Sequence, residues 1–234
     1  MGECLFMRRG TIRTAPFVPK PTFANNTWAE IVRACHTNRV PDSWAVGNQK
    51  TMTIGGVNYT IDIIGKNHDD YADGSGKAPL TFQLHDCYNK DGVNGSSTNV
   101  GGWTYSGMRA TKLPAIMALM PGEVQAGIRR VNKQTSEGSQ RSTIVTTADK
   151  LFLLSEVEVR GVIPFSFSGE GSRYDYYSNG NSSVKYFSGA LTGWWTRSPR
   201  NLYTTQFCIV STSDNSSDVA VAAATSGVAP AFCF

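Results

Sequence analysis

The sequence predicts an α+β protein with small antiparallel sheets, two main helices and much irregular loop. Of its 234 residues only 17% are charged and 23 are glycine, which is typical of loop-rich proteins with β character and not of helical bundles. A helix start with complementary capping residues lies near residue 27, and a Gly-Gly hairpin signal lies at residues 55–56. No linker or repeat divides the chain, so we expect one domain, residues 23–234, after an N-terminal extension, residues 1–22.

The N-terminal extension contains Pro16, Pro19 and Pro21 without a periodic pattern, which indicates an extended segment. A helix follows, because Thr27 can cap it and Glu30 can return the capping bond. One apolar face at helical spacing supports it: Trp28, Ile31, Val32 and Cys35. We expect this helix to end at Pro41.

Strand-forming residues dominate three segments after the helix. Lys50–Ile54 and Val57–Ile64 flank Gly55-Gly56 and predict a hairpin, and Leu80–Leu84 predicts a further strand.

Three carboxylates in the segment 67–77 admit two interpretations. Asp69, Asp70 and Asp73 could ligate calcium, which takes six to eight oxygens, but their spacing is not that of an EF-hand. A turn in which an Asp side chain accepts from the backbone is the simpler alternative, and we expect no metal and no cofactor.

The middle of the chain gives weaker signals. Asn89–Gly102 is rich in Gly, Asn and Ser and indicates a loop. The segment from Ser106 to Met120 has helical spacing, and Pro114 allows it to form two shorter helices. The remaining expectations are extended pieces at Val124–Lys133 and Thr143–Val145 around a polar loop, Gln134–Gln140, and a helix at Lys150–Val157. An aromatic group, Tyr174, Tyr176, Tyr177, Tyr186 and Phe187, could stack on sugar, but we favour a core position.

The last forty-one residues, Trp194–Phe234, have rigid ends and a polar middle. The middle, Asn201–Val228, contains no Lys, Glu, Trp or Met and a single Gln, Gln206. Its other residues all belong to the set obtained when the two adenines of an asparagine codon (AAC) are replaced freely. The four residues after Pro230 are apolar or aromatic, so the end of the chain is predicted to be a strand inside a sheet.

The two ends of this stretch carry specific motifs. Trp194–Pro199 reads Trp-Trp-x-Arg-Ser-Pro, and Gly227–Cys233 reads Gly-Val-Ala-Pro-x-Phe-Cys. Shorter matches lie upstream: Trp28–Ile31, Trp44–Gly47, residues 68–76, residues 101–109 and Leu151–Glu156. With these motifs the chain resembles bacterial and prophage-encoded variable proteins of diversity-generating retroelements, in which a reverse transcriptase randomises adenines in a C-terminal segment.

The resemblance implies a C-type-lectin-like fold of the formylglycine-generating-enzyme subtype, with variable residues at about 196–226. It also implies a receptor-recognition protein, such as a phage or prophage tail protein or surface adhesin, and not an enzyme. Its ligand would be a protein or glycan of a bacterial cell surface, and Tyr203 is the best aromatic anchor. The expected variable face consists of Asn201, Leu202, Tyr203, Thr205, Ile209, Ser211, Ser213, Asp214, Asn215, Ser217, Asp218, Ala220, Ala222 and Thr225. The expected structural residues are Trp194, Trp195, Arg197, Cys208 and Phe232, with Arg197 paired to a buried acid or carbonyl.

Two rivals stay open: a formylglycine-generating-type enzyme using Cys208 and Cys233, and a purely structural virion subunit. His85 and Cys87 form half of a zinc site at most, and no hydrolase, P-loop or dinucleotide motif occurs. Scattered basic residues at a net charge of +4 argue against nucleic acid, and no apolar run could span a membrane. We expect no secretory signal, and a location in a virion or in the bacterial cytoplasm. The cysteines are expected to be buried free thiols. The expected partners are other virion proteins, bound through the N-terminal segment, and further copies of the chain.

Overall fold

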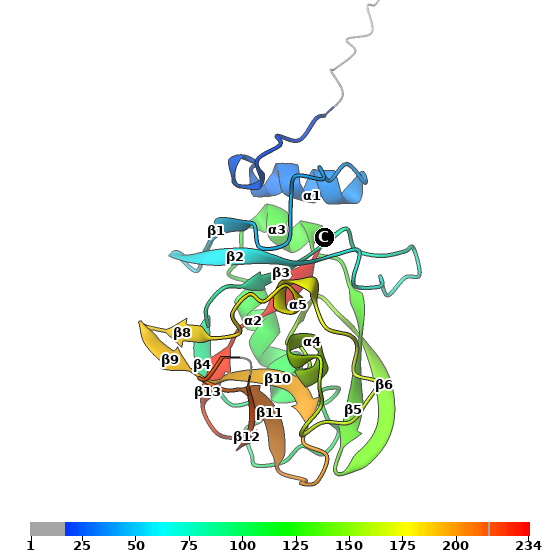
Figure 1. Ribbon diagram of the computed structural model, residues 1–234, viewed down its shortest axis with the longest axis vertical. Helices are drawn as coiled ribbons and strands as arrows, with labels where there is room; N and C mark the ends of the chain where they lie inside the picture. The colour runs from blue at the N-terminus through cyan, green and yellow to red at the C-terminus, as the bar shows by residue number, and fades with distance from the viewer. Residues whose placement is uncertain (1–16, 215) are drawn as a thin grey trace, which may run out of the picture.

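The computed structural model describes residues 17–214 and 216–234 and has an α+β fold (Figure 1). Two five-stranded sheets dominate the described residues. Across the first sheet the strands are β1 (Gln49–Ile54), β2 (Val57–Lys66), β3 (Leu80–Leu84), β14 (Ala231–Cys233) and β7 (Leu151–Phe152). Across the second they are β12 (Ser217–Val221), β11 (Gln206–Val210), β10 (Trp194–Pro199), β13 (Ser226–Val228) and β4 (Asn89–Asp91). The remaining strands form two hairpins, β5 (Val131–Gly138) with β6 (Arg141–Asp149) and β8 (Lys185–Phe187) with β9 (Ala190–Thr192).

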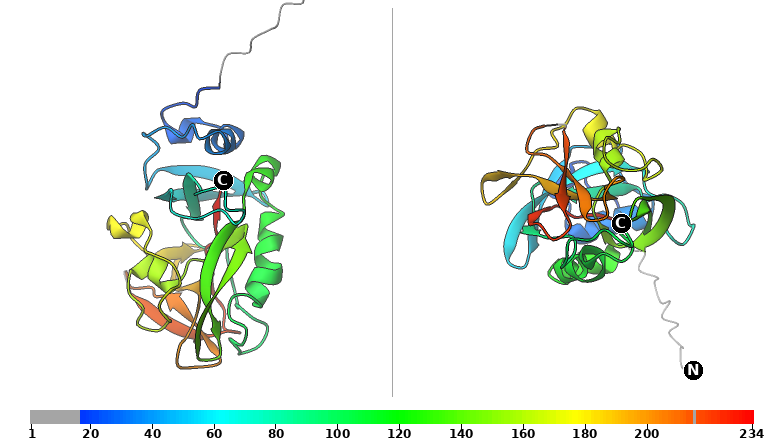
Figure 2. Two further views of the ribbon diagram at one scale, coloured as in Figure 1. Left: turned by 90° about the vertical axis from the view of Figure 1, so that its right-hand side faces the viewer. Right: turned by 90° about the horizontal axis from the view of Figure 1, so that it is seen from below.

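The helices are short and lie around the sheets. They are η1 (Phe23–Asn25), α1 (Trp28–His36), η2 (Met108–Lys112), α2 (Leu113–Met117), α3 (Gly122–Gly127), α4 (Glu156–Arg160) and α5 (Asp175–Ser178). η2 is π-helical and continues into α2, and together they run along one side of the molecule (Figure 2). The α+β class with small antiparallel sheets and much loop is therefore confirmed.

Local sequence signals produced the N-terminal elements. Both bonds of the predicted capping box form at α1, between Thr27 and Glu30. The helix ends at His36, earlier than Pro41, because the chain turns through Asn38 at φ 51°. The hairpin and the strand Leu80–Leu84 are confirmed, and Gly55 and Gly56 both have the positive φ that the turn between β1 and β2 requires.

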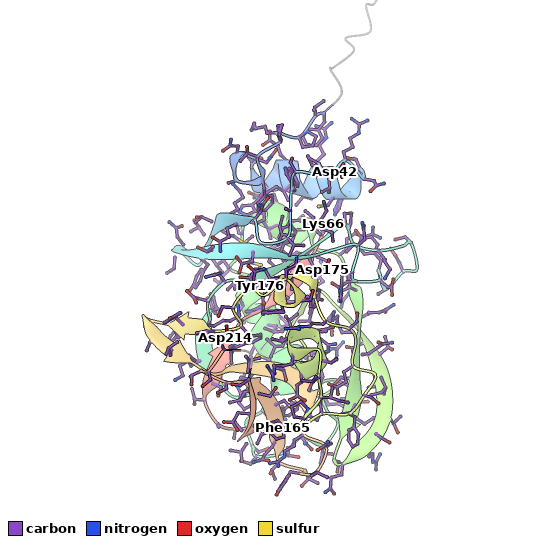
Figure 3. All side chains as sticks on the ribbon, in the orientation of Figure 1. Asp42, Lys66, Phe165, Asp175, Tyr176 and Asp214 are labelled. Atoms are coloured by element: carbon purple, nitrogen blue, oxygen red, sulfur yellow. The ribbon has the colours of Figure 1, made fainter. Side chains whose placement is uncertain are left out.

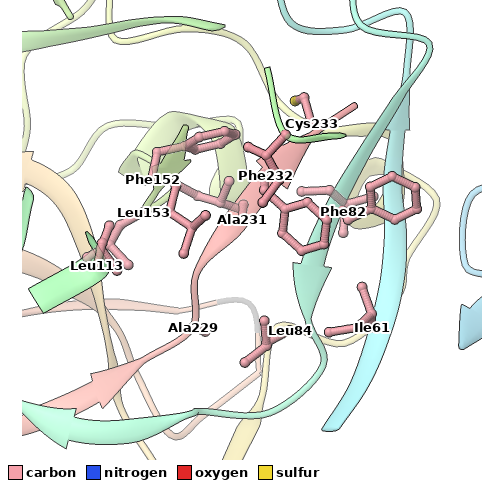
Figure 4. Packing of buried hydrophobic residues seen from close by; sticks show 14 of the residues in the cluster. Ile61, Phe82, Leu84, Leu113, Phe152, Leu153, Ala229, Ala231, Phe232 and Cys233 are labelled. Atoms are coloured by element: carbon pink, nitrogen blue, oxygen red, sulfur yellow. The ribbon is translucent and has the colours of Figure 1, made fainter. Parts of the chain in front are cut away.

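The core lies between the first sheet and α1, and continues toward the second sheet. Phe82 of β3 stacks on Phe232 of β14 with ring centroids 5.3 Å apart and packs against Trp28 of α1 at 6.0 Å (Figure 4). Phe234 is fully buried, and Tyr71 Oη donates to its carbonyl at 2.7 Å. Burying each such ring stabilises the fold by about 1.5–3 kcal/mol.

The end of the chain joins the two sheets. β13 pairs with β10 and β4 in the second sheet, and after Pro230 β14 enters the first sheet between β3 and β7. The predicted buried terminal strand is thus confirmed, but Val228 belongs to β13 and not to the final strand.

Several mid-chain predictions are wrong. Asn89–Asp91 is a strand, Val124–Gly127 lies in α3, and the supposed polar loop Gln134–Gln140 is mostly β5. The predicted helix at Lys150–Val157 is replaced by β7 and then α4, whose capping box is Ser155 with Glu158. In the aromatic group Tyr174, Tyr176 and Tyr177 are core residues, but Tyr186 is exposed.

Residues 17–22 of the N-terminal extension lie against the domain. Arg39 donates to the Phe17 carbonyl at 2.8 Å, and Trp44 Nε1 donates to the Lys20 carbonyl at 3.0 Å. None of the helices in the described part of the chain has the length and apolarity that a bilayer crossing needs.

Candidate ligand-binding face

The Trp-Trp-x-Arg-Ser-Pro motif forms β10, the central strand of the second sheet. All six residues of this strand are buried. Trp194 Nε1 donates to the Ser183 carbonyl at 2.9 Å, and Trp195 Nε1 donates to the Asp91 carbonyl at 2.7 Å. The motif therefore gives the sheet a rigid centre.

Arg197 is the charged centre of this frame and is fully buried. Its guanidinium donates to Glu158 Oε1 at 2.9 Å and to the carbonyls of Leu153 and Glu170 at 3.0 and 2.8 Å. The expected pairing with a buried acid is confirmed. Lys133 continues the network, with Nζ 2.8 Å from Glu158 Oε1 and 2.6 Å from Asp69 Oδ1.

The pKa values of this network keep its members charged. Burial by itself raises the pKa of Asp69, but Lys133 and the Thr81 hydroxyl outweigh burial and hold that pKa at about 2. Burial likewise opposes the charge of Glu158, and the adjacent Arg197 and Lys133 lower its pKa. The network thus ties β5, α4 and β10 together as permanent ion pairs.

The polar run after β10 forms β11, β12 and the loops around them. Leu202, Tyr203, Ser213, Asp214, Asp218 and Thr225 are exposed. The half-buried predicted residues are Asn201, Thr205, Ile209, Ser211, Ser217 and Ala220. Ala222 is fully buried, so its assignment to the variable face is wrong: its N–H donates to Thr205 and its carbonyl accepts from Asn94, which draws it into the structure. Asn215 lies outside the described residues.

Four of the predicted residues meet in one surface hollow of ≈310 Å³: Ile209, Ser211, Asp218 and Thr225. Asp218 lies directly across from Ile209 in the β11–β12 register. Lys90 and Leu191 are among the other residues of its wall, and Leu191 is 52% exposed. An apolar centre from Ile209 and Leu191 with charges at Lys90 and Asp218 suits a ligand that is partly apolar and partly polar.

The predicted residues that lie in loops are at the two ends of β11, while Ser217 and Ala220 belong to β12. Asp214 marks one end, and Phe165, whose carbonyl accepts from the Asn201 N–H at 2.8 Å, marks the other (Figure 3). At the second end the Tyr203 ring packs under the Arg200 guanidinium, 3.9 Å from its centroid. The predicted set is therefore not one compact patch, because the sheet separates its two loops.

Residues outside the run hold the backbone of the β10–β11 loop. The Asn99 side-chain amide donates to the carbonyls of Tyr203 at 2.7 Å and Gln206 at 2.8 Å. The Asn99 N–H donates to the Thr204 carbonyl at 2.7 Å, and Gln140 Nε2 donates to the Leu202 carbonyl at 2.8 Å. These four bonds position the loop through its carbonyls, and the Asn201 side chain adds a bond to the Ser166 carbonyl at 3.2 Å.

Asp214 holds the loop between β11 and β12 through its side chain. Its Oδ1 accepts from the Ser183 N–H at 2.8 Å and from the Ser182 and Ser183 hydroxyls at 3.1 Å each. A carboxylate in this role is less replaceable than Leu202 or Tyr203.

Sequence reasoning did not find Lys90, Leu191, Asn99 or Gln140. Lys90 and Asn99 lie in the segment 89–102, where composition indicates only a loop, and Gln140 is in a hairpin turn. No local signal marks such residues, because their partners are distant in sequence: Asn99 binds Tyr203, 104 positions away, and Gln140 binds Leu202, 62 positions away.

The carboxylates of the segment 67–77 do not converge. Asp69 pairs with buried Lys133, Asp70 with Lys77, and Asp73 with Arg129. Asp73 Oδ1 also accepts from the Ser75 N–H at 3.0 Å, which confirms the turn interpretation. Among residues 17–214 and 216–234 no group of three or more metal-ligating side chains comes together.

Four cysteines, Cys35, Cys87, Cys208 and Cys233, are buried free thiols, as expected. Cys208 lies in the second sheet and Cys233 in the first. Burial raises the pKa of both thiols well above the ordinary value, so neither is a ready thiolate.

Fold and site together define an α+β protein in which a buried Trp-Trp-x-Arg-Ser-Pro strand carries a surface hollow and two polar loops. Residues 84–234 match the family model described as "Domain of unknown function (DUF6273)", and the chain belongs to this family. The match contains the second sheet, the hollow and both loops. No curated protein and no solved structure matches the chain.

Proposed function

We propose that this chain is a ligand-recognition protein whose binding face is diversified, on a C-type-lectin-like fold, as in the variable proteins of diversity-generating retroelements. The ligand is a protein or glycan of a bacterial cell surface, and the carrier is a phage or prophage tail or a surface adhesin. The motifs at Trp194–Pro199 and Gly227–Cys233 motivate the resemblance.

The observation that supports the proposal most is the set of hydrogen bonds from Asn99 and Gln140 to the backbone of the β10–β11 loop. A binding face can change its side chains only if its backbone does not depend on them. Asn99 and Gln140 meet this condition, because they bind the carbonyls of Leu202, Tyr203 and Gln206, which every residue type provides.

The contrast between the buried residues of β11 and the exposed residues around them also supports the proposal. Phe207, Cys208 and Val210 of β11 are buried, while Leu202, Tyr203, Ser213 and Asp218 around them are exposed. Replacement of exposed side chains generally changes stability by no more than about 0.5 kcal/mol, so a diversified set costs little.

Burial of Cys208 and Cys233 in different sheets favours recognition over a formylglycine-generating-type enzyme. The alternative is a purely structural virion subunit, which binding measurements distinguish from a ligand-recognition protein.

The test is a library in which only Leu202, Tyr203, Ser211, Ser213, Asp218 and Thr225 are randomised, displayed on phage or yeast and selected on whole bacterial cells. We expect folded variants in most of the library, melting temperatures close to that of the parent, and selection of binders with different strain preferences. A matched library randomising Phe207, Cys208, Val210 and Ala222 should lose folding. Widespread unfolding of the first library would contradict the proposal, and folded variants that never yield binders would favour the structural rival.

In the genome, we expect a near-copy of the 3′ end that differs mainly at adenines, located beside a reverse transcriptase gene.

A further inference from the structure

A second and larger hollow, of ≈520 Å³, lies away from the Ile209–Leu191 hollow, between the β5–β6 hairpin and the segment 100–105. The β5–β6 hairpin stands on the opposite side of the molecule from the β8–β9 hairpin that borders the first hollow (Figure 1). The volume of the larger hollow falls in the range of roughly 300–1,000 Å³ that small-molecule sites occupy.

The two segments that border this hollow pack against each other backbone to backbone. Gly102 and Gly138 have positive φ, and a Cβ on Gly138 would collide with the Asn99 carbonyl, as one on Gly102 would with the Ser136 carbonyl. The Ser139 N–H donates to Asn99 Oδ1 at 2.9 Å and fixes the hairpin turn to the same segment. The hollow is therefore preformed and does not require a ligand to shape it.

Tyr105 stands at the wall with 81% of its surface exposed. Its ring lies against Gly101, where any side chain would collide with it: a Cβ on Gly101 would lie 2.7 Å from Tyr105 Cδ2. An aromatic ring with its surface open to solvent offers a flat apolar surface to a ligand.

The polar groups of the hollow carry no net charge. Arg141 Nη1 lies 3.8 Å from Glu137 Oε2, too far for a hydrogen bond, and their side chains are 70% and 36% exposed. Each therefore keeps the capacity to bind two neighbouring polar atoms of a ligand side by side. Thr104 Oγ1 is buried beneath this wall, out of reach of a ligand in the hollow.

We propose that this hollow is a binding site for a neutral saccharide. A pyranose presents an apolar C–H face, which fits the Tyr105 ring, and a rim of adjacent hydroxyls, which fits the carboxylate of Glu137 and the guanidinium of Arg141. The balanced charge of Glu137 and Arg141 gives no preference to a phosphate or an ammonium ligand. This site uses no residue of the polar run after β10 and does not depend on the function proposed for that run.

The test is titration of the ¹⁵N-labelled full chain with the methyl glycosides of glucose, galactose, mannose and N-acetylglucosamine. Each is added to about 50 mM, above the millimolar dissociation constant expected of one ring in one hollow. We expect at least one to shift the amide signals of Gly101, Tyr105 and Ser139. Tyr105→Ala should weaken that binding about tenfold, the loss of one ring contact.

Tyr186→Ala is the matched control, because Tyr186 is 44% exposed on the β8–β9 hairpin, and it should leave binding unchanged. Glu137→Gln keeps the shape of the side chain and should weaken binding without changing the melting temperature. The proposal is overturned if none of the four glycosides shifts these amides, if the shifts appear only around Leu191 and Ile209, or if Tyr105→Ala binds as the parent does.

Discussion

Arg197 and Glu158 form a buried ion pair in which Nη2 of the arginine lies 2.9 Å from Oε1 of the carboxylate. Arg197 belongs to the Trp-Trp-x-Arg-Ser-Pro strand, and Glu158 closes the capping box of α4. One carboxylate thus caps a helix and neutralises the centre of the second sheet, which links the two elements.

Arg197→Met is expected to destabilise the protein by about 3–5 kcal/mol, because it removes one of the two buried cations that neutralise Glu158 and leaves the carbonyls of Leu153 and Glu170 without its donors. Urea unfolding monitored by tryptophan fluorescence measures this change. Lys77→Met is the control, since the Lys77–Asp70 pair is exposed, at 50% and 65%, and should change stability by less than about 1 kcal/mol. Equal losses in the two variants would show that the buried network does not hold the sheet.

Trp194→Ala is expected to cost about 3–5 kcal/mol, because the side chain is fully buried and its removal opens a cavity. Leu202→Ala, at a position 66% exposed in the β10–β11 loop, should stay within about 0.5 kcal/mol of the parent. Thermal or urea unfolding of both variants tests the contrast between frame and loop. A similar loss in Leu202→Ala would assign that loop to the core.

Asn99→Ala should loosen the β10–β11 loop, because it removes the amide bonds to the carbonyls of Tyr203 and Gln206 and the acceptor of the Ser139 N–H, and the Gln206 carbonyl then keeps only the Arg200 N–H. Each buried group left unpaired costs about 1–3 kcal/mol. Hydrogen exchange at the Ser139, Arg200 and Asn201 amides should accelerate. Asn94→Ala removes two comparable amide bonds, to Thr98 and Gly107, and should leave exchange at Arg200 and Asn201 unchanged. Unaltered exchange in Asn99→Ala would remove the main support for the proposed function.

His85 should make stability depend on pH through Asp62. The hydrogen bond from His85 Nδ1 to Asp62 Oδ2, 2.8 Å long, raises the pKa of His85. A raised folded-state pKa means that the protonated imidazole stabilises the fold below the unfolded value of about 6.5, and that this contribution disappears as pH rises through the folded value. His85 is 42% exposed, so solvent screens the contribution.

NMR titration of His85 measures its pKa directly, and Asp62→Asn should bring that value down. Urea unfolding at pH 6 and pH 8 should show a smaller pH dependence in Asp62→Asn than in the parent. A His85 pKa at or below 6.5 in the parent would contradict the pairing.

Elements with local signals can be predicted from the amino-acid sequence alone. The Thr27–Glu30 capping box and the Gly55-Gly56 turn act over a few residues, so their bonds form as the pattern predicts. The two adjacent tryptophans of the Trp194–Pro199 motif favour burial because both side chains are large and apolar.

Tertiary structure decided the rest. The part of β5 from Gln134 onward reads as a loop because its residues are polar; Thr135 and Ser136 are buried because Glu170, distant in sequence, supplies their partner. Likewise Ala222 is buried by its pairing with Thr205, and the β10–β11 loop is held by Asn99. Hydrogen bonds between distant segments depend on which segments the fold brings together. The local sequence of one segment does not contain this information.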